Sequence, residues 1–175
     1  MAIVIRPGRP DEAALLSDLA LRSKGFWGYS EKLLDSFRRE LALSPSDVVG
    51  LRTAVAELRG TVVGFVTVDG SAPTGDLGML FVVPEAIGNG VGTELFRHAV
   101  EVARGAGFRR LVIESDPNAE PFYRAMGAIR VGSTESGSVP GRELPLLEVD
   151  IVPIAAAPRT GPPRGRLTGG ADLSG

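Results

Sequence analysis

The sequence predicts an α/β fold, with one mixed, mostly antiparallel sheet of about seven strands, a central parallel pair and about four flanking helices. Strand and helix patterns follow one another in the order β-α-α-β-β-β-α-β-α-β-β, which is typical of helices packed on a single sheet. Two alternating segments, residues 53–58 and 61–69, are separated by Arg59-Gly60, as in a β-hairpin. A helical pattern at 91–106 connects two apolar strands, and a right-handed crossover of this kind joins parallel strands.

Length and composition indicate one globular domain. The chain has 175 residues, of which 43% are hydrophobic and 23% charged, as in an ordinary globular protein. We expect residues 1–154 to form the domain. Residues 155–175 are rich in proline, glycine and arginine and have almost nothing to bury, so we expect a disordered tail.

The same numbers exclude several kinds of function. A net charge of -2 argues against a general nucleic-acid binder, which needs a basic face for phosphates. The chain has no cysteine and one histidine, which leaves no thiolate zinc site and nearly excludes an imidazole-rich metal site, so we expect no metal. No apolar run reaches the ~18 residues of a membrane span, and no signal peptide is visible at the N-terminus. We therefore expect a cytoplasmic protein without a membrane partner.

The first third of the chain predicts one strand and two helices. Residues 1–6 form a short apolar strand, and residues 11–24 carry leucines at helical spacing with acidic residues in the first turn. Ser30 is a suitable N-cap for a second helix over 31–43, and Pro45 is interpreted as the signal that ends it.

The remaining elements alternate between strand and helix. Besides a loop at 70–75 and the helix at 91–106, the patterns predict four further strands, one short helix and one polar loop. These are strands 76–83, 111–113 and 128–131, a helix at 119–126, a loop at 133–142 and a last strand at 144–152.

The stretch from residue 80 to residue 94 is the most informative. A β-branched and aromatic strand stops at Pro84, three glycines follow at positions 88, 90 and 92, and a helix begins there. The first amides of a helix have no partner within it, and the helix dipole places partial positive charge on them. Since glycines let the backbone approach an anion closely, this turn suits a phosphate, although a tight turn alone would also explain it.

Two familiar phosphate-binding motifs fit the turn poorly. A nucleoside-triphosphate loop needs a lysine before Ser/Thr, whereas here Gly92 precedes Thr93 directly. A dinucleotide fingerprint needs G-x-G-x-x-G immediately after the strand, whereas residues 84–87 intervene and the glycine spacing differs. Glu114 ends the next strand and would suit a ribose hydroxyl, so this second interpretation stays open.

A third interpretation comes from resemblance. Val83-Pro84-Glu85 with Gly88-Asn89-Gly90-Val91-Gly92-Thr93, followed by Asn118-Ala119-Glu120-Pro121-Phe122-Tyr123-Arg124-Ala125-Met126-Gly127-Ala128, resembles the GNAT superfamily of acyl-CoA-dependent N-acyltransferases. The resemblance covers about residues 3–151. It implies a GNAT-like domain that transfers the acetyl group of acetyl-CoA directly to a primary amine of a small molecule or peptide. Family members often form dimers, so a homodimer is also expected.

The resemblance also implies which residues hold acetyl-CoA. The pantetheine arm would pair with the backbone of Phe81, Val82 and Val83, and Asn118 and Phe122 would lie beside it. The diphosphate would bind main-chain amides of one continuous run, which consists of Gly88, Asn89, Gly90, Val91, Gly92 and Thr93. Family members commonly have Arg or Gln where this chain has Ile87, which removes one contact but leaves the backbone donors.

The resemblance implies that Tyr123 is the general acid that protonates the departing thiolate. The base is less clear, because many family members carry a Glu at the position that aligns with Gly78. Asp76, two residues earlier on the strand, is the first candidate to act through a water, and Glu57 is the second. A main-chain N–H near Leu80 or Phe81 would meet the oxyanion.

Trp27 and Tyr29 are the candidate acceptor residues, because the family forms one wall of the acceptor cleft with this region. Aromatic walls suit an apolar body or, by cation–π contact, an ammonium group. Alternatively, Trp27 anchors the two helices to the core. The loop at 133–142 would form the opposite wall.

The sequence also allows an alternative function. Gly78 and Ile87 stand where family members commonly carry functional side chains, so a non-catalytic acyl-CoA-binding regulatory module is the alternative to an enzyme.

Overall fold

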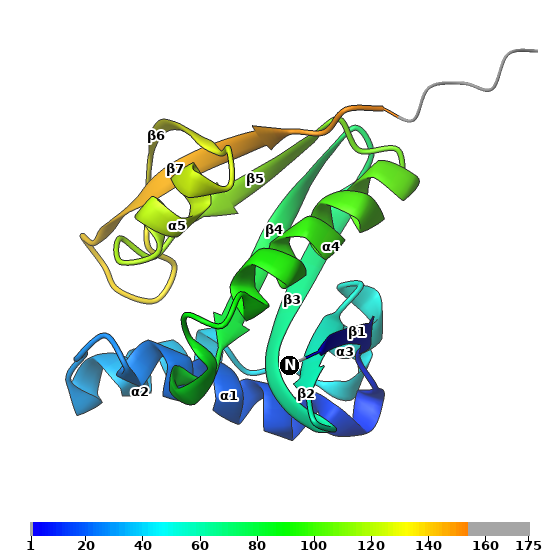
Figure 1. Ribbon diagram of the computed structural model, residues 1–175. Helices are drawn as coiled ribbons and strands as arrows, with labels where there is room; N and C mark the ends of the chain where they lie inside the picture. Colours follow the sequence, from blue (N-terminus) through cyan, green and yellow to red (C-terminus); the bar gives the residue numbers. More distant parts are fainter. Residues whose placement is uncertain (1, 154–175) are drawn as a thin grey trace, which may run out of the picture.

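The computed structural model describes residues 2–153, whose seven strands form one sheet in the order β1-β2-β3-β4-β5-β7-β6 (Figure 1). The strands are β1 (Ile3–Pro7), β2 (Ala54–Leu58), β3 (Thr61–Ser71), β4 (Thr74–Val82), β5 (Arg110–Glu114), β6 (Ile129–Glu135) and β7 (Glu143–Asp150). All neighbouring strands pair antiparallel except β4 and β5, which are parallel. The predicted mixed sheet with one parallel pair is confirmed.

The parallel pair is short, and this leaves one side of β4 without a neighbouring strand over most of its length. β4 pairs with β5 only where Thr74–Asp76 faces Arg110–Val112. Beyond that point β4 continues to Val82 beside β3, and Figure 1 shows β4 and β5 diverging. From Leu77 onward, β4 therefore has a strand neighbour on one side only. We call the other side, from Leu77 to Val82, the open edge.

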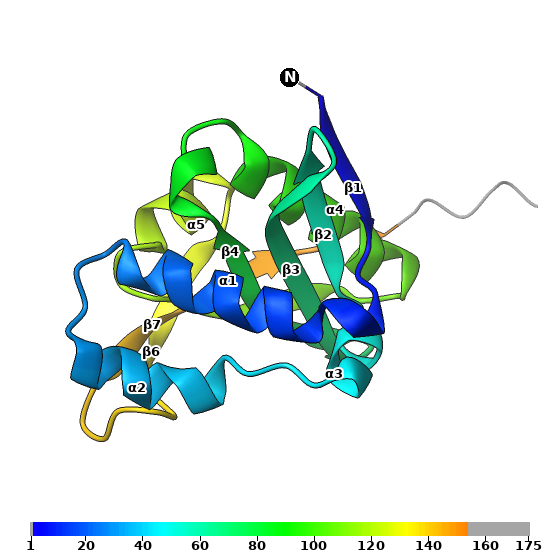
Figure 2. The same cartoon turned by 90° about the horizontal axis from the view of Figure 1, so that it is seen from below.

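Helices cover both faces of the sheet. They are α1 (Ala13–Gly25), α2 (Glu31–Glu40), α3 (Pro45–Gly50), α4 (Val91–Gly105) and α5 (Glu120–Ala125). In Figure 2, α1 crosses in front of β2, β3 and β4, whereas α4 lies behind them. Buried Leu95 and Ala99 of α4 belong to the same core as Phe65 of β3. The close approach of α4 needs Gly64, because a Cβ there would lie 3.0 Å from Leu95 Cδ1.

One helix was not expected. We interpreted Pro45 as the end of a helix, but α2 ends at Glu40 and Pro45 begins α3. Ser44 is its N-cap, accepting from the Asp47 amide, and Asp47 in turn accepts from the Ser44 amide. Proline suits the first helical position because the missing N–H would have no partner there. The part of the chain that the structure describes thus has five α-helices rather than about four.

Other differences concern element ends. The expected loop at 70–75 is mostly strand, since β3 runs to Ser71 and β4 starts at Thr74. β6 reaches Glu135, so the loop between the last two strands spans only 136–142. The expected tail, 155–175, lies outside the described residues. Over residues 2–153, none of the helices has both the length and the apolar character that crossing a membrane requires.

Candidate functional site

A cavity of about 590 Å³ opens where β4 and β5 diverge. Its walls come from six parts of the chain: the end of α1 with the following loop, α2, the open edge of β4, the turn before α4, the segment after β5, and the segment after β6. The lining residues are Ser23, Lys24, Trp27, Phe37, Glu40, Leu41, Gly78, Met79, Leu80, Phe81, Val82, Ala86, Ile87, Gly88, Gly90, Gly92, Thr93, Glu114, Asp116, Asn118, Ala119, Phe122, Tyr123, Ser136, Ser138, Arg142 and Leu144.

The open edge supplies main-chain donors and acceptors. β3 pairs Val68 with Leu77 and Thr67 with Met79, so Gly78 is an extra, bulged residue. The Met79 amide donates to Thr67 Oγ1 over 2.9 Å, and the Val83 amide donates to Val63 O over 2.8 Å. Because N–H groups alternate along a strand, the amides of Leu80 and Val82 point to the open edge. This geometry favours Leu80 over Phe81 as an oxyanion donor.

The turn before α4 has the geometry that a bound anion needs. Gly88 and Gly90 have φ angles of +87° and +82°, and a Cβ at either position would point into open space. Gly90 is the N-cap of α4 and has no side chain to occupy the first helical amides. The amides of residues 91–93 therefore face outward unpaired, whereas the Asn89 amide already donates to Ala86 O over 3.3 Å. These residues fit the diphosphate of coenzyme A.

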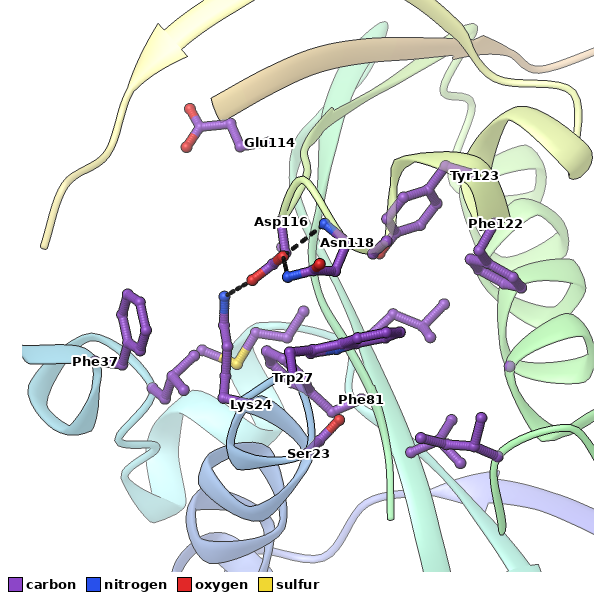
Figure 3. A pocket seen from close by; sticks show the side chains of 18 of the residues that line it. Ser23, Lys24, Trp27, Phe37, Phe81, Glu114, Asp116, Asn118, Phe122 and Tyr123 are labelled. Carbon is purple, nitrogen blue, oxygen red and sulfur yellow. Dashed lines mark hydrogen bonds and ion pairs between the residues drawn. The ribbon is translucent and has the colours of Figure 1, made fainter. Parts of the chain in front are cut away.

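Tyr123 lies across the cavity from the open edge. It belongs to α5, its side chain is only 6% exposed, and its ring packs edge-on against Phe122 with centroids 5.2 Å apart. Figure 3 shows its hydroxyl end directed toward Asn118. Burial, and secondarily the charge of Asp116, raise the pKa of the Tyr123 hydroxyl well above its usual value. The phenol is therefore protonated throughout the neutral range.

A group of polar side chains joins three segments at the other end of the cavity. We call Lys24, Tyr29, Asp116, Asn118 and Arg142 the polar cluster. The Asp116 carboxylate is its centre, because it accepts from Lys24 Nζ over 2.7 Å and from the main-chain amide of Asn118 over 2.8 Å (Figure 3). It also accepts from the Tyr29 hydroxyl over 2.8 Å. The Tyr29 hydroxyl accepts in turn from Asn118 Nδ2 and from Arg142 Nη2, at 3.1 and 2.6 Å.

The charges of the polar cluster follow from these contacts. Burial raises the pKa of the Asp116 carboxyl, but the hydrogen bond and charge of Lys24 outweigh it, and the pKa lies below its usual range. Burial and the hydrogen bond to Asp116 raise the pKa of Tyr29. At neutral pH, Asp116 is thus an anion and Tyr29 a neutral donor.

Apolar side chains line the space between the polar cluster and the open edge. Phe37 is buried beneath Lys24, whose Nζ lies 4.7 Å from the ring centroid. Trp27 is 43% exposed and packs edge-on against Phe26, with centroids 5.1 Å apart. Trp27 is therefore a wall of the cavity rather than a core anchor of the two helices.

The structure brings most of the predicted site residues together. Those that line the cavity are Trp27, Phe81, Val82, Gly88, Gly90, Gly92, Thr93, Asn118, Phe122 and Tyr123. Val83, Asn89 and Val91 adjoin them in the chain without lining the cavity, and Tyr29 lies behind Asn118 in the polar cluster. The loop at 136–142 contributes Ser136, Ser138 and Arg142 to the opposite wall, as expected.

The two candidate bases lie elsewhere. Asp76 faces Asp69 across the β3–β4 pair and does not line the cavity. Strict alternation of side chains would put Asp76, two residues before Gly78, on the same face of β4 as Gly78, but the bulge at Gly78 interrupts this alternation. Glu57 accepts from Arg6 Nε over 2.7 Å, in an ion pair between β1 and β2.

Three functional candidates were missed by the sequence analysis: Lys24, Asp116 and Arg142. Each is a charged residue next to an element end, and nothing in the local pattern separates it from a solvated charge. The available signal was the position of Asp116 directly after the apolar strand that leads to the Asn118 motif. Lys24 and Arg142 become recognisable only when the fold brings them to that carboxylate.

Comparisons with known proteins agree with this geometry. Residues 16–128, more than half of the chain, match the model of the acetyltransferase (GNAT) family. A search of curated proteins found no match to the chain.

Solved structures share the fold. A GCN5-related N-acetyltransferase from Rhodopseudomonas palustris has a TM-score of 0.72 at 23% identity, covering 86% of this chain and 96% of that one. The PaiA N-acetyltransferase from Thermoplasma acidophilum, in complex with coenzyme A, has a TM-score of 0.71 at 22% identity, covering 86% and 99%. YncA from Salmonella typhimurium, with acetyl-CoA, has a TM-score of 0.63 at 18% identity, covering 90% and 98%.

Proposed function

Because the chain belongs to the acetyltransferase (GNAT) family, we propose that it moves the acetyl group of acetyl-CoA directly to a primary amine of a small molecule or peptide. One observation carries the proposal: the open edge of β4 leads to the unpaired first amides of α4, and Tyr123 lies across the same cavity. The PaiA and YncA structures, which contain coenzyme A and acetyl-CoA, support this choice of ligand.

We propose that main-chain groups hold the acyl donor. The amides at Gly90 and residues 91–93 bind the diphosphate, and Val82 pairs with the pantetheine arm along the open edge. Phe122 closes the side of this path, since its ring lies 3.4 Å from the position of a Cβ on Gly92. Ile87 contributes apolar contact where an arginine or glutamine would add a polar one.

Transfer forms a C–N bond to the amine and breaks the C–S bond of the thioester. The Leu80 amide points to the open edge and donates to the oxygen that becomes negative during attack. Tyr123 gives its proton to the departing sulfur and takes back the proton that the nitrogen loses once the C–N bond has formed, and the raised pKa of Tyr123 favours this return of the proton to the phenol. Neither Asp76 nor Glu57 lines the cavity. The two glutamates that do, Glu40 and Glu114, are exposed to solvent, so the amine loses its first proton to water before attack.

The test uses the full chain with acetyl-CoA and a panel of primary amines, while free thiol is followed with a colorimetric reagent. We expect thiol release that requires both substrates, and a matching mass increase of 42 Da in the amine, roughly one acetyl group in place of a hydrogen. Isothermal calorimetry measures coenzyme A binding separately. No binding of coenzyme A would refute the proposal.

The same measurements separate the alternative functions. Tight coenzyme A binding without transfer to any amine would instead indicate the acyl-CoA-binding regulatory module. The observation that favours this module is that Gly78 and Ile87 stand where family members commonly carry functional side chains. Binding of NAD without coenzyme A would indicate the dinucleotide interpretation of Glu114. The homodimer and the cytoplasmic location stay predictions.

A further inference from the structure

The polar cluster carries more positive than negative charge. Lys24 Nζ lies 2.7 Å from Asp116 Oδ2, and Arg142 Nη2 lies 3.7 Å from the same oxygen. Two cations thus share one carboxylate, which leaves a formal charge of about +1 at neutral pH. All three side chains are largely buried, with 12%, 19% and 10% of Lys24, Arg142 and Asp116 exposed. Burying an unbalanced charge is unfavourable, so this arrangement suits an additional anion.

Arg142 has donors available for that anion. Of its five N–H groups, Nη2 donates to the Tyr29 hydroxyl, while Nε and Nη1 have no acceptor among residues 2–153. The guanidinium lies over the Tyr29 and Phe37 rings, at 5.1 and 5.3 Å from their centroids, which fixes its plane. Nη2 carries a second N–H besides the one that Tyr29 accepts, and together with the N–H of a free neighbouring nitrogen it forms the paired donor edge that matches the two oxygens of a carboxylate.

The loop at 136–142 keeps Arg142 in position. The Ser136 amide donates to Arg142 O over 2.6 Å, and the Arg142 amide donates to Val139 O over 3.2 Å. Ser136 Oγ accepts from the Val139 amide over 3.2 Å, so the loop closes on itself. Ser136 and Ser138 of the same loop also line the cavity, and their hydroxyl groups are further donors for an oxyanion.

Two other carboxylates line the cavity, and they do not balance the cluster. Glu40 and Glu114 are both exposed to solvent, and within residues 2–153 neither forms an ion pair with Lys24 or Arg142. An exposed charge is stabilised by water, whereas a buried one needs a partner. The excess positive charge therefore favours an anionic group of a ligand at the end of the cavity formed by the polar cluster.

We propose that the acceptor is an amine that also carries a carboxylate, on an apolar body, and that Arg142 and Lys24 bind this carboxylate. Trp27 and Phe37 line the space between the cluster and the open edge, Met79 of the open edge also lines the cavity, and these side chains suit an apolar body. The acceptor amine then faces the Leu80 amide and Tyr123. This inference rests on the proposed acetyltransferase function and names the class of its second substrate.

The test compares acceptors that differ only in the carboxylate. One set is phenylalanine, leucine and methionine with their amides; the other is ω-amino acids, from β-alanine to 6-aminohexanoate, with the matching alkylamines. We expect the best carboxylated acceptor to exceed its uncharged counterpart about 30-fold in kcat/KM, the effect of a charged hydrogen-bonded pair. Equal rates for both members of every pair would overturn the inference.

Variants separate binding of the carboxylate from support of the loop. Arg142→Gln is expected to lower kcat/KM about 30-fold for the carboxylated acceptor and less than about threefold for its uncharged counterpart. Arg142→Lys should restore part of the loss. Arg38→Gln, which removes an exposed cation of α2, is the control and should change neither. If Arg142→Gln lowered both rates equally, Arg142 would have a structural role only, and the inference would be wrong.

A binding measurement makes the result independent of turnover. Calorimetry on the protein saturated with coenzyme A should detect phenylalanine or 6-aminohexanoate, and Arg142→Gln should abolish the signal. If the carboxylated amine binds but no thiol is released from acetyl-CoA, the binding of the carboxylate by Arg142 stands and the proposed reaction fails, so the amine is a ligand and not an acceptor. If none of the carboxylated amines binds better than its counterpart, the acceptor inference fails while coenzyme A binding still tests the reaction.

Discussion

The two ends of the cavity are built differently. Toward α4, the site consists of main-chain amides on a glycine turn and on the open edge, with few side chains that carry charge. Toward α1 and α2, it consists of side chains from separate segments that meet at Asp116. A main-chain site depends on backbone conformation and tolerates many sequences, whereas the polar cluster depends on the identity of each member. The first suits a ligand shared by a family, and the second suits a ligand particular to one protein.

The largest expected effect is on coenzyme A affinity, and it comes from changing the glycine turn before α4, at the end of the cavity that consists of main-chain amides. Gly88→Val with Gly90→Val places β-branched residues at φ angles of +87° and +82°, which they strongly disfavour. We expect coenzyme A affinity to fall more than about 100-fold in calorimetry, since each left-handed residue costs about 1–2 kcal/mol and the amides move. Gly105→Ala, at the opposite end of α4 with an ordinary φ and open space, is the control and should bind normally. Normal binding by the double variant would show that the turn does not hold the diphosphate.

Tyr123→Phe tests the residue that lies between the two ends. Removing the hydroxyl should lower kcat about 100-fold, the usual range for loss of a general acid, while coenzyme A affinity changes less than about threefold. Steady-state kinetics and calorimetry on the same preparation give both values. An unchanged kcat would remove Tyr123 from the mechanism.

Asp116→Asn tests the polar cluster through its effect on the free energy of unfolding. It leaves Lys24 and Arg142 without their anion, and we expect about 2 kcal/mol less free energy of unfolding in urea at pH 7. Because the pKa of folded Asp116 is lowered, its contribution is present above the unfolded pKa of about 4 and is lost as the pH falls below it.

The difference between Asp116→Asn and the native chain should therefore shrink between pH 5 and about pH 3. Asp35→Asn, which breaks an exposed pair with Arg38, is the control and should cost less than about 0.5 kcal/mol at any pH. A difference that stayed constant down to pH 3 would contradict an ionised Asp116 at the centre of the cluster.

The smallest expected effect is a gain. Ile87 lines the cavity beside the glycine turn and is 42% exposed. Ile87→Arg should raise coenzyme A affinity about threefold at low salt, and the gain should diminish at high salt because the added contact is an exposed charge. Ile87→Gln is the uncharged control, with a smaller gain that salt does not change. A loss of affinity in both variants would show that the turn needs an apolar residue there.

Sequence analysis was most successful for the parts of the fold that depend on the backbone. The glycine turn, the crossover helix and the parallel pair each leave a local pattern, so their places in the fold could be predicted, whereas coenzyme A binding at this turn stays a prediction. Asp76 was misplaced because alternation cannot reveal the bulge at Gly78, which arises from the pairing with Thr67. Lys24, Asp116 and Arg142 come from segments far apart in the chain, and only tertiary structure makes them neighbours. Pro45 was misinterpreted because proline both ends and begins helices.

The loop at 136–142 is closed by its own hydrogen bonds and joins the last two strands at the rim of the cavity. Exchanging this short hairpin connection for another of similar length leaves the sheet pairing and the glycine turn untouched. Divergence toward new acceptors can then proceed by replacing a peripheral segment, without any new solution to the problem of binding the donor nucleotide.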